Sequence, residues 1–184
     1  KAITPKTKAV ITVDIGGCPC QYDKIKEMLS EEAVLKQYTP KTDTQKKLNR
    51  ILLMSDSAHA TGAEFKNKTI TQWVDVSVQS FHAVKNITSA EGGAICLNLP
   101  EQFDVESTRK YFKLMTLNGQ TKDAFTKNQA GAWRYDIVDF GMKINLPDIN
   151  AAVALAQLRK YDYLLQERKR VFELFKNNIK NKIV

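Results

Sequence analysis

Several features are scarce in this sequence of 184 residues, and each absence excludes a class of protein. With only 8 glycines and 5 prolines, the chain is neither collagen-like nor a low-complexity linker. No apolar run approaches the roughly 20 residues that a transmembrane helix requires, so we expect no membrane span. The first ten residues carry positive charge but no apolar stretch follows them, so no secretory signal is predicted.

Cysteine and histidine are also rare. The cysteines are Cys18, Cys20 and Cys96, and the histidines are His59 and His82. Because no Cys-x-x-Cys or His-x-x-x-His pair occurs among them, no metal site is predicted. An odd number of cysteines without a secretory signal favours a reducing compartment. We therefore expect a cytoplasmic protein whose cysteines have structural roles.

The composition that remains is typical of a folded, basic protein. Hydrophobic residues make up 43% of the chain and charged residues 26%, which argues against global disorder. The net charge of +8 suits an anionic partner, such as nucleic acid, acidic lipid or a phosphorylated small molecule, but also a plain solvated surface. Because the basic residues are scattered and not interleaved with aromatic ones, nucleic acid is not favoured.

Short apolar runs alternate with helical patterns along the first two thirds of the chain. Strands are predicted where β-branched or alternating residues dominate, over 8–14, 50–55, 74–81 and 94–97. Helical spacing of apolar residues occurs over 22–35 and 103–117. The polar stretches interpreted as loops are 36–49 and 118–139. This alternation predicts an α/β fold with a largely parallel sheet.

After residue 146, apolar residues recur at three- and four-residue spacing almost to the end of the chain. Pro147 is suited to the first turn of a helix. The pattern predicts one long helix, or two in series with a break near Tyr161.

Four polar residues stand at or just beyond the predicted strand ends: Asp14, Asp56, Ser80 and Lys85. In parallel sheets, ligands bind at the carboxyl ends of the strands. Asp56 could neutralise a positive group on a bound ring, or could simply cap a turn. Lys85 is flanked by apolar residues, so it is either a surface lysine or a partly desolvated amine that can attack a carbonyl.

Four segments then carry a resemblance to a known family. They are SDSAHATGA at 55–63, SFHAVKNIT at 80–88, EGG at 91–93 and GMKINLPDINAA at 141–152. In this order and spacing they resemble the DegT/DnrJ/EryC1/StrS aminotransferases, pyridoxal-phosphate enzymes that act on keto sugars attached to nucleotides. The resemblance runs from about Pro5 to the end, with 36–49 as an insertion. It implies the aspartate aminotransferase-like fold, with a mostly parallel sheet, flanking helices and long helices leading toward a small domain.

The resemblance also implies roles for individual residues. Lys85 would form a Schiff base with pyridoxal 5′-phosphate and then move a proton on the substrate. Asp56 would pair with the pyridinium nitrogen of the cofactor, so that the ring withdraws carbanion charge. His59 would contact the ring or its phenolic oxygen, and Ser80 would bind the cofactor phosphate. His82 belongs to the motif, but we expect a packed structural histidine.

Further residues are implied to serve substrate or a neighbouring subunit. Lys143 and Asn145 would reach into the partner's site, near substrate or the cofactor phosphate, which implies a homodimer. In the loop 118–139, Trp133 could stack on a sugar or uracil and Arg134 could pair with a diphosphate. Contacts between subunits explain these two residues equally well.

The match also departs from the family pattern. Pro147 stands where threonine is usual, and the chain starts after the family's block that cradles the cofactor phosphate. We therefore expect a fragment, a truncated chain or half of a split protein. Residues 1–146 would be part of the cofactor-binding large domain, and residues 147–184 would be helices linking to or starting the small domain.

These observations lead to one main hypothesis about function and to two alternatives. The main hypothesis is an aminotransferase that moves an amino group, from glutamate, to a nucleotide-linked keto sugar by way of Lys85. One alternative is a non-catalytic or truncated relative that acts as an interaction or regulatory subunit. The other, motivated only by the net charge, is a nucleic-acid-binding domain.

Overall fold

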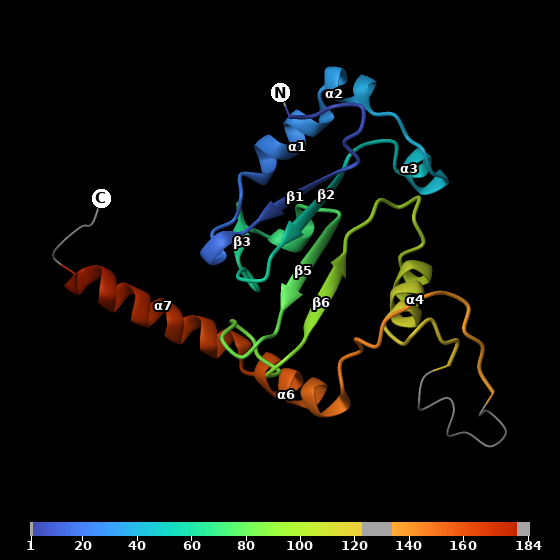
Figure 1. The fold of residues 1–184 in the computed structure, drawn as a ribbon. Helices are drawn as coiled ribbons and strands as arrows, with labels where there is room; N and C mark the ends of the chain where they lie inside the picture. The colour runs from blue at the N-terminus through green and yellow to red at the C-terminus, as the bar shows by residue number, and fades with distance from the viewer. Residues whose placement is uncertain (1, 123–133, 180–184) are drawn as a thin grey trace.

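A four-stranded sheet forms the centre of the computed structural model, which describes residues 2–122 and 134–179 (Figure 1). The strands are β1 (Ala9–Val13), β2 (Leu52–Asp56), β5 (Val76–Ser80) and β6 (Gly93–Leu97). They lie in the order β1-β2-β5-β6, and β1, β2 and β5 are parallel. The prediction of an α/β fold with a mostly parallel sheet is therefore confirmed.

In the four-stranded sheet β6 is antiparallel to its neighbour, because of the way the chain returns from β5. β6 pairs with β5 in an antiparallel ladder, joining Ser80 to Gly93 and Val76 to Leu97. Residues 81–92 between them form a hairpin loop with no crossover helix, and a direct return of this kind reverses the strand. The amide of Phe81 donates to the carbonyl of Gly92 at 2.8 Å and closes the base of this loop.

The helices before β2 differ from the predicted ones. Instead of one helix over 22–35, the structure has α1 (Tyr22–Ser30) and α2 (Glu32–Gln37), because Glu31 between them has extended backbone. The prediction of a loop over 36–49 is also wrong, since it contains α3 (Asp43–Leu48). The Thr42 side chain accepts a hydrogen bond from the Gln45 amide and so caps the start of this helix.

Between β2 and β5 the chain makes a small excursion without an α-helix. It forms the two-stranded hairpin of β3 (Glu64–Phe65) and β4 (Lys68–Thr69), followed by the 3₁₀ turn η2 (Ile70–Gln72). The indole of Trp73 donates to the Phe65 carbonyl at 2.9 Å, which ties the end of the excursion back to its hairpin.

One face of the sheet is buried and the other is largely open. The buried side chains that pack on the first face are Tyr22, Leu29, Tyr38, Ile51, Leu53, Ala60, Ile70 and Val74. On the second face apolar side chains are exposed, among them Ile11 (64%), Val13 (48%) and Ile95 (46%). The core of this part of the chain therefore lies between the sheet and α1.

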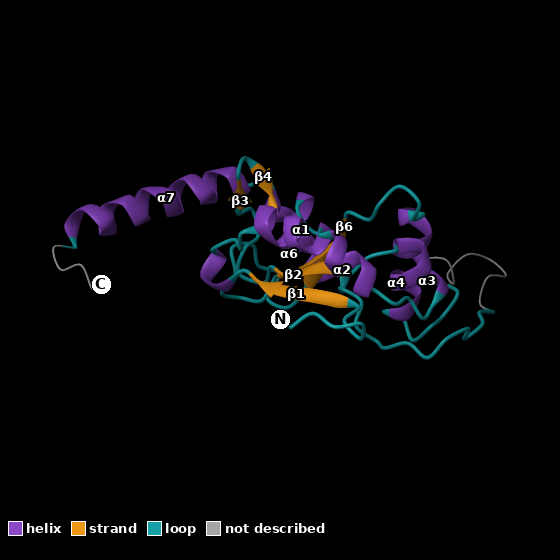
Figure 2. Cartoon of the chain, turned by 90° about the horizontal axis from the view of Figure 1, so that it is seen from above, coloured by secondary structure: helices purple, strands orange, loops and turns teal. Residues whose placement is uncertain are grey.

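The later helices are α4 (Val105–Met115), α6 (Asp148–Leu158) and α7 (Tyr161–Asn178). The predicted long helix is thus two helices, with the break immediately before Tyr161. In Figure 1, α6 lies beyond the carboxyl ends of the parallel strands, and in Figures 1 and 2 α7 runs away from the sheet. Among the residues described, no helix is long and apolar enough to cross a membrane.

The predicted loop 118–139 is partly ordered by pairing at its ends. Gln120 and Ile137 form an antiparallel bridge, as do the flanking Leu117 and Lys143. The amide of Val138 also donates to the carbonyl of Gly119 at 3.0 Å. Residues 123–133 lie outside the described part of the chain.

A bidentate ion pair stabilises the edge of the sheet at which β2 and β5 begin. The Arg50 guanidinium donates to both carboxylate oxygens of Asp75, at 2.6 and 2.7 Å. The Leu53 amide donates to the same carboxylate at 2.9 Å. The Asp75 side chain is 9% exposed. The hydrogen bond from Arg50 to Asp75 raises the pKa of Arg50.

We expect Asp75→Ala to lower the free energy of unfolding by about 2 to 3 kcal/mol, because it leaves a half-buried cation and a buried strand amide without their acceptor. The matched control is Lys36→Ala, which breaks an exposed pair with Glu32 and is expected to cost less than about 1 kcal/mol. Urea unfolding of the two variants measures both values. Equal losses would contradict the role given to Asp75.

Candidate active site

A buried carboxylate organises the carboxyl edge of the sheet. Asp14, directly after β1, is 1% exposed. Its oxygens accept hydrogen bonds from the hydroxyls of Tyr22 (2.6 Å), Ser55 (2.5 Å) and Ser57 (3.0 Å) and from the amide of Cys20 (3.1 Å). Burial, together with the hydrogen bond to Asp14, raises the pKa of Tyr22, so that its phenol keeps the proton it donates.

Asp56 points away from this cluster. Because Ser55 and Ser57 turn toward Asp14, the residue between them projects from the opposite face of the strand, and Asp56 is exposed. One of its oxygens accepts from the Ala58 amide at 3.1 Å. Its other oxygen accepts no hydrogen bond from the residues described here. The carboxylate is therefore available to a positive group.

His59 lies in the turn that follows, with one ring nitrogen engaged. Its Nδ1 accepts a hydrogen bond from the Gly16 amide at 3.2 Å. A neutral imidazole that accepts at Nδ1 carries its proton on Nε2, so the Nε2–H of His59 can donate to a ligand oxygen. A Cβ on the neighbouring Gly17 would stand 3.0 Å from the His59 carbonyl oxygen, so this approach suits glycine.

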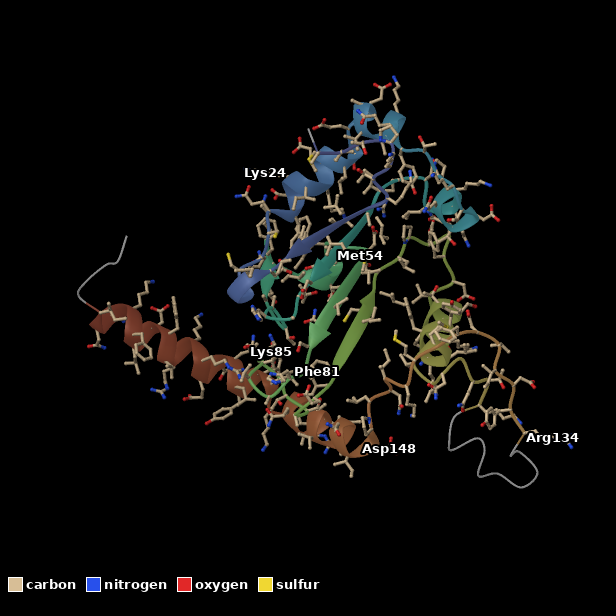
Figure 3. All side chains as sticks on the ribbon, viewed as in Figure 1. Lys24, Met54, Phe81, Lys85, Arg134 and Asp148 are labelled. Atoms are coloured by element: carbon tan, nitrogen blue, oxygen red, sulfur yellow. The ribbon has the colours of Figure 1, made fainter. Side chains whose placement is uncertain are left out.

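Lys85 lies in the loop between β5 and β6, close to the start of α7 (Figure 3). Its backbone amide donates to the His82 carbonyl at 3.0 Å, forming a turn. The side chain is half-buried, and within the described residues its amine has neither a hydrogen bond nor an ion pair. Ser80, at the end of β5, accepts from the His82 amide at 3.3 Å.

The prediction that His82 is packed is wrong. Its side chain is 49% exposed, and its Nε2 lies 3.7 Å from a carboxylate oxygen of Glu91. The cysteines form no disulfide, and Cys18 is exposed, so the structural role predicted for cysteine does not hold at this position. Within the described ranges no group of three or more histidine, cysteine, aspartate or glutamate side chains gathers as metal ligands would.

Asn145 borders a surface pocket between α4 and the sheet, which is also lined by Val78, Ile95 and Arg109. Lys143 donates a hydrogen bond to the side-chain oxygen of Asn145. The pocket thus lies on the same face of the sheet as Asp56, because Asp56 pairs in register with Val78.

The other two predicted substrate residues are not placed beside Lys85. Figure 3 shows Arg134 at the far side of the molecule, beyond α4. Trp133 lies outside the described residues. Of the predicted site residues, the structure therefore brings Asp56, His59, Ser80 and Lys85 to one edge of the sheet.

Four further residues, to which the sequence pattern gave no role in a site, hold this edge together: Thr61, Asn86, Tyr161 and Asn150. The Thr61 carbonyl accepts hydrogen bonds from Asn86, at 3.2 Å, and from the phenol of Tyr161, at 2.5 Å. The Asn150 amide donates to the carbonyls of Ser89 and Glu91. The signals in the sequence were Gly62 and the placement of Thr61, Asn86 and Asn150 in the segments that resemble the family.

A sheet of this topology, with a lysine and a carboxylate at its carboxyl edge, defines an α/β protein of the fold shared by sugar aminotransferases. The chain belongs to the DegT/DnrJ/EryC1/StrS aminotransferase family, whose model matches residues 43–182. This confirms the resemblance on which the predicted roles rest.

Individual relatives are similar over nearly the whole chain. Spr1654 from Streptococcus pneumoniae, described as a putative sugar aminotransferase, superposes in its PMP form with a TM-score of 0.88 and 40% identity, covering 97% of this chain. Helicobacter pylori PseC, an aminotransferase of pseudoaminic acid biosynthesis, gives 0.73 and 27% over 99% of this chain. The uncharacterized protein MJ1066 of Methanocaldococcus jannaschii is 32% identical over 98% of this chain.

The relatives are considerably longer than this chain. It spans 44% of the Spr1654 chain and 41% of both PseC and MJ1066. What the whole relatives do is therefore a hypothesis for this protein.

The two aspartates at the sheet edge are expected to respond differently to the same substitution. Asp14→Asn places an amide against four donors in a buried cluster, and we expect the free energy of unfolding to fall by about 2 to 4 kcal/mol. Asp56→Asn changes an exposed side chain, and we expect a change within about 0.5 kcal/mol. Urea denaturation followed by circular dichroism measures both. A larger loss for Asp56→Asn would refute the division into a structural and an available carboxylate.

Proposed function

We propose that this chain supplies the lysine-bearing part of a pyridoxal-phosphate-dependent sugar aminotransferase. The observation that supports this most is a pair of groups at one sheet edge: the half-buried amine of Lys85, and the exposed carboxylate of Asp56, of which only one oxygen accepts a hydrogen bond within the described residues. Asn86, next to Lys85, is hydrogen-bonded to Thr61, which lies in the turn after Asp56. The two segments are thereby tied together.

The residues present fit this cofactor. When bound, pyridoxal phosphate serves as an electron sink that stabilises negative charge on the substrate carbon. Asp56 would keep a proton on the ring nitrogen, since a carboxylate favours the charged pyridinium. His59 has its Nε2–H available for the phenolic oxygen, and Ser80 has a hydroxyl that can donate to phosphate.

Lys85 would hold the cofactor aldehyde and move the proton. A lysine does this best when its amine is partly desolvated, because desolvation favours the neutral, nucleophilic form. Lys85 is half-buried in the structure, which supports such surroundings. We propose glutamate as the amino donor.

The acceptor that we propose is a nucleotide-linked keto sugar. The similarity to Spr1654, which is described as a putative sugar aminotransferase, supports a sugar. The pocket beside Asn145 is bordered by Lys113 and by Arg109, which is itself paired with Glu106, and the chain carries a net charge of +8, which suits an anionic group such as a diphosphate. We further propose a cytoplasmic protein in which residues 1–146 belong to the large domain and residues 147–184 lead to the small domain.

We also propose a homodimer in which Lys143 and Asn145 serve a partner's site. Arg134 lies far from Lys85 within one chain, so a substrate contact by Arg134 would have to be made in the site of a second copy (Figure 3). Trp133, next to it in sequence, is proposed to accompany it.

Chemical trapping tests the central residue. The protein is incubated with pyridoxal 5′-phosphate, reduced with borohydride and digested, and the modified lysines are identified by mass spectrometry. We expect the adduct to concentrate on Lys85, because its half-buried amine has no partner among the described residues and its loop is tied to the turn after Asp56. Lys85→Arg should abolish this peptide adduct, and Asp56→Ala should weaken it by about tenfold or more.

Exposed lysines provide the control in the same experiment. Lys36 is paired with Glu32 on the surface and should gain only background label in every variant. Label spread evenly over the surface lysines would remove Lys85 from the proposed role. Site-specific label without formation of 2-oxoglutarate from glutamate would instead favour the non-catalytic relative.

The proposed substrate contact predicts a split between kinetic parameters. Arg134→Ala should raise the KM for the sugar nucleotide while leaving the half reaction with the amino donor unchanged, since a guanidinium that pairs with diphosphate acts only in binding the acceptor. Steady-state kinetics with each substrate varied in turn measures this. An unchanged KM would eliminate Arg134 as a substrate contact.

A further inference from the structure

The loop that carries Lys85 is attached to α7 through one backbone carbonyl. The carbonyl oxygen of Thr61 accepts from Asn86 Nδ2 at 3.2 Å and from Tyr161 Oη at 2.5 Å. The hydroxyl of Thr61 donates to the buried Gln79 side chain on β5 at 2.7 Å. Three segments distant in sequence therefore meet at Thr61: the turn after Asp56, the Lys85 loop and the first residue of α7.

The far end of the same loop is attached to α6. Asn150 Nδ2 donates to the carbonyls of Ser89, at 2.7 Å, and Glu91, at 3.2 Å. These carbonyls flank Ala90, whose φ of +67° is a left-handed conformation that a residue with a Cβ adopts only at an energetic cost. Ser89 itself is fully buried, and its amide donates to Phe81. One side-chain amide thus stabilises a strained turn at the end of the loop.

Close approaches at both attachments are compatible only with glycine. A Cβ on Gly62, whose φ is +78°, would stand 1.8 Å from the phenolic oxygen of Tyr161. A Cβ on Gly92 would stand 2.7 Å from a methyl group of Leu146, which immediately precedes the α6 region. The fit between the helices and the loop therefore extends beyond the hydrogen bonds.

Both attachments use donors that stay in the right form at neutral pH. Burial raises the pKa of Tyr161, so its phenol keeps the proton that it gives to Thr61. The Asn150 amide does not titrate, and its two hydrogens match the two carbonyls it contacts.

We propose that Asn150 and Tyr161 are positioning residues that fix the 81–92 loop and thereby set where the Lys85 amine lies relative to Asp56. The inference rests on the proposed function only in taking Lys85 as the reactive amine. The position of the 81–92 loop would then depend on α6 and α7, because a displacement of either helix would be passed to the loop through Thr61, Ser89 and Glu91.

The test uses two variants, each of which removes the donor at one attachment. Tyr161→Phe deletes one hydroxyl, and Asn150→Asp replaces the amide hydrogens with an oxygen that repels the two carbonyls. One matched control is Tyr111→Phe, in which a residue on α4 loses its hydrogen bond to Asp139. The other is Asn98→Asp, which loses a hydrogen bond to the Val74 carbonyl at the other end of the sheet.

Two readouts are compared. Amide hydrogen exchange, followed by mass spectrometry, reports the opening of residues 81–92, and borohydride trapping with pyridoxal 5′-phosphate reports the rate and the pH midpoint of adduct formation at Lys85. We expect each test variant to speed exchange in 81–92 about tenfold and to slow labelling of Lys85 by a similar factor, as the loss of an ordinary hydrogen bond implies. Exchange in β1 and β2 and labelling of Lys36 should match the controls.

The outcomes separate this inference from the proposed function. Unchanged exchange over 81–92 in both test variants would overturn it, as would an equal rise across β1 and β2, which would mean that the contacts serve only global stability. If the unaltered protein shows no preferential label at Lys85, the proposed function fails, whereas the exchange measurement still decides whether α6 and α7 hold the loop. A shifted pH midpoint in Tyr161→Phe, absent from Tyr111→Phe, would support positioning of the amine.

Discussion

The arrangement of this sheet edge depends on one buried negative charge. The carboxylate of Asp14 is enclosed, and a buried charge is stable only when donors satisfy it. The hydroxyls of Ser55 and Ser57 are two of its donors, so the end of β2 cannot rotate without removing donors from this charge. That restriction decides the direction of Asp56, which must emerge on the other face. One aspartate thus fixes the orientation of the second, and the exposed one remains available to a ligand.

The sequence could locate these two aspartates but could not distinguish them. Both follow a short apolar run, so local pattern predicted a strand end in each case, and the sheet and its parallel strands were predicted correctly on the same basis. Burial of Asp14 depends on Tyr22, which approaches from α1, and no local pattern records that contact. The prediction for His82 failed for a related reason, because a turn places it beside Glu91 in solvent.

Long-range contacts account for most of what the sequence did not show. Tyr161 contacts a carbonyl one hundred positions earlier, and Asn150 bridges two carbonyls about sixty positions earlier. Tyr161 was predicted only as a possible helix break, which proved nearly correct while its role was missed. The helix at 43–48, in contrast, had a readable signal, since Thr42 and Gln45 have the spacing of a helix N-terminus. The segment 36–49 was predicted as a loop because it is polar, although the Thr42–Gln45 spacing indicated the start of a helix.

The two sides of the proposed site are held by interactions of different strength. Asp56 owes its direction to a buried charge with four donors, which costs about 2 to 4 kcal/mol to disrupt. The Lys85 loop is held by neutral hydrogen bonds, each worth about 1 kcal/mol. A group that only stabilises a ring nitrogen benefits from being rigid. In the proposed function the Lys85 amine would bind, release and carry a proton, and the hydrogen bonds to Thr61, Ser89 and Glu91 would keep its loop in place while the side chain does so.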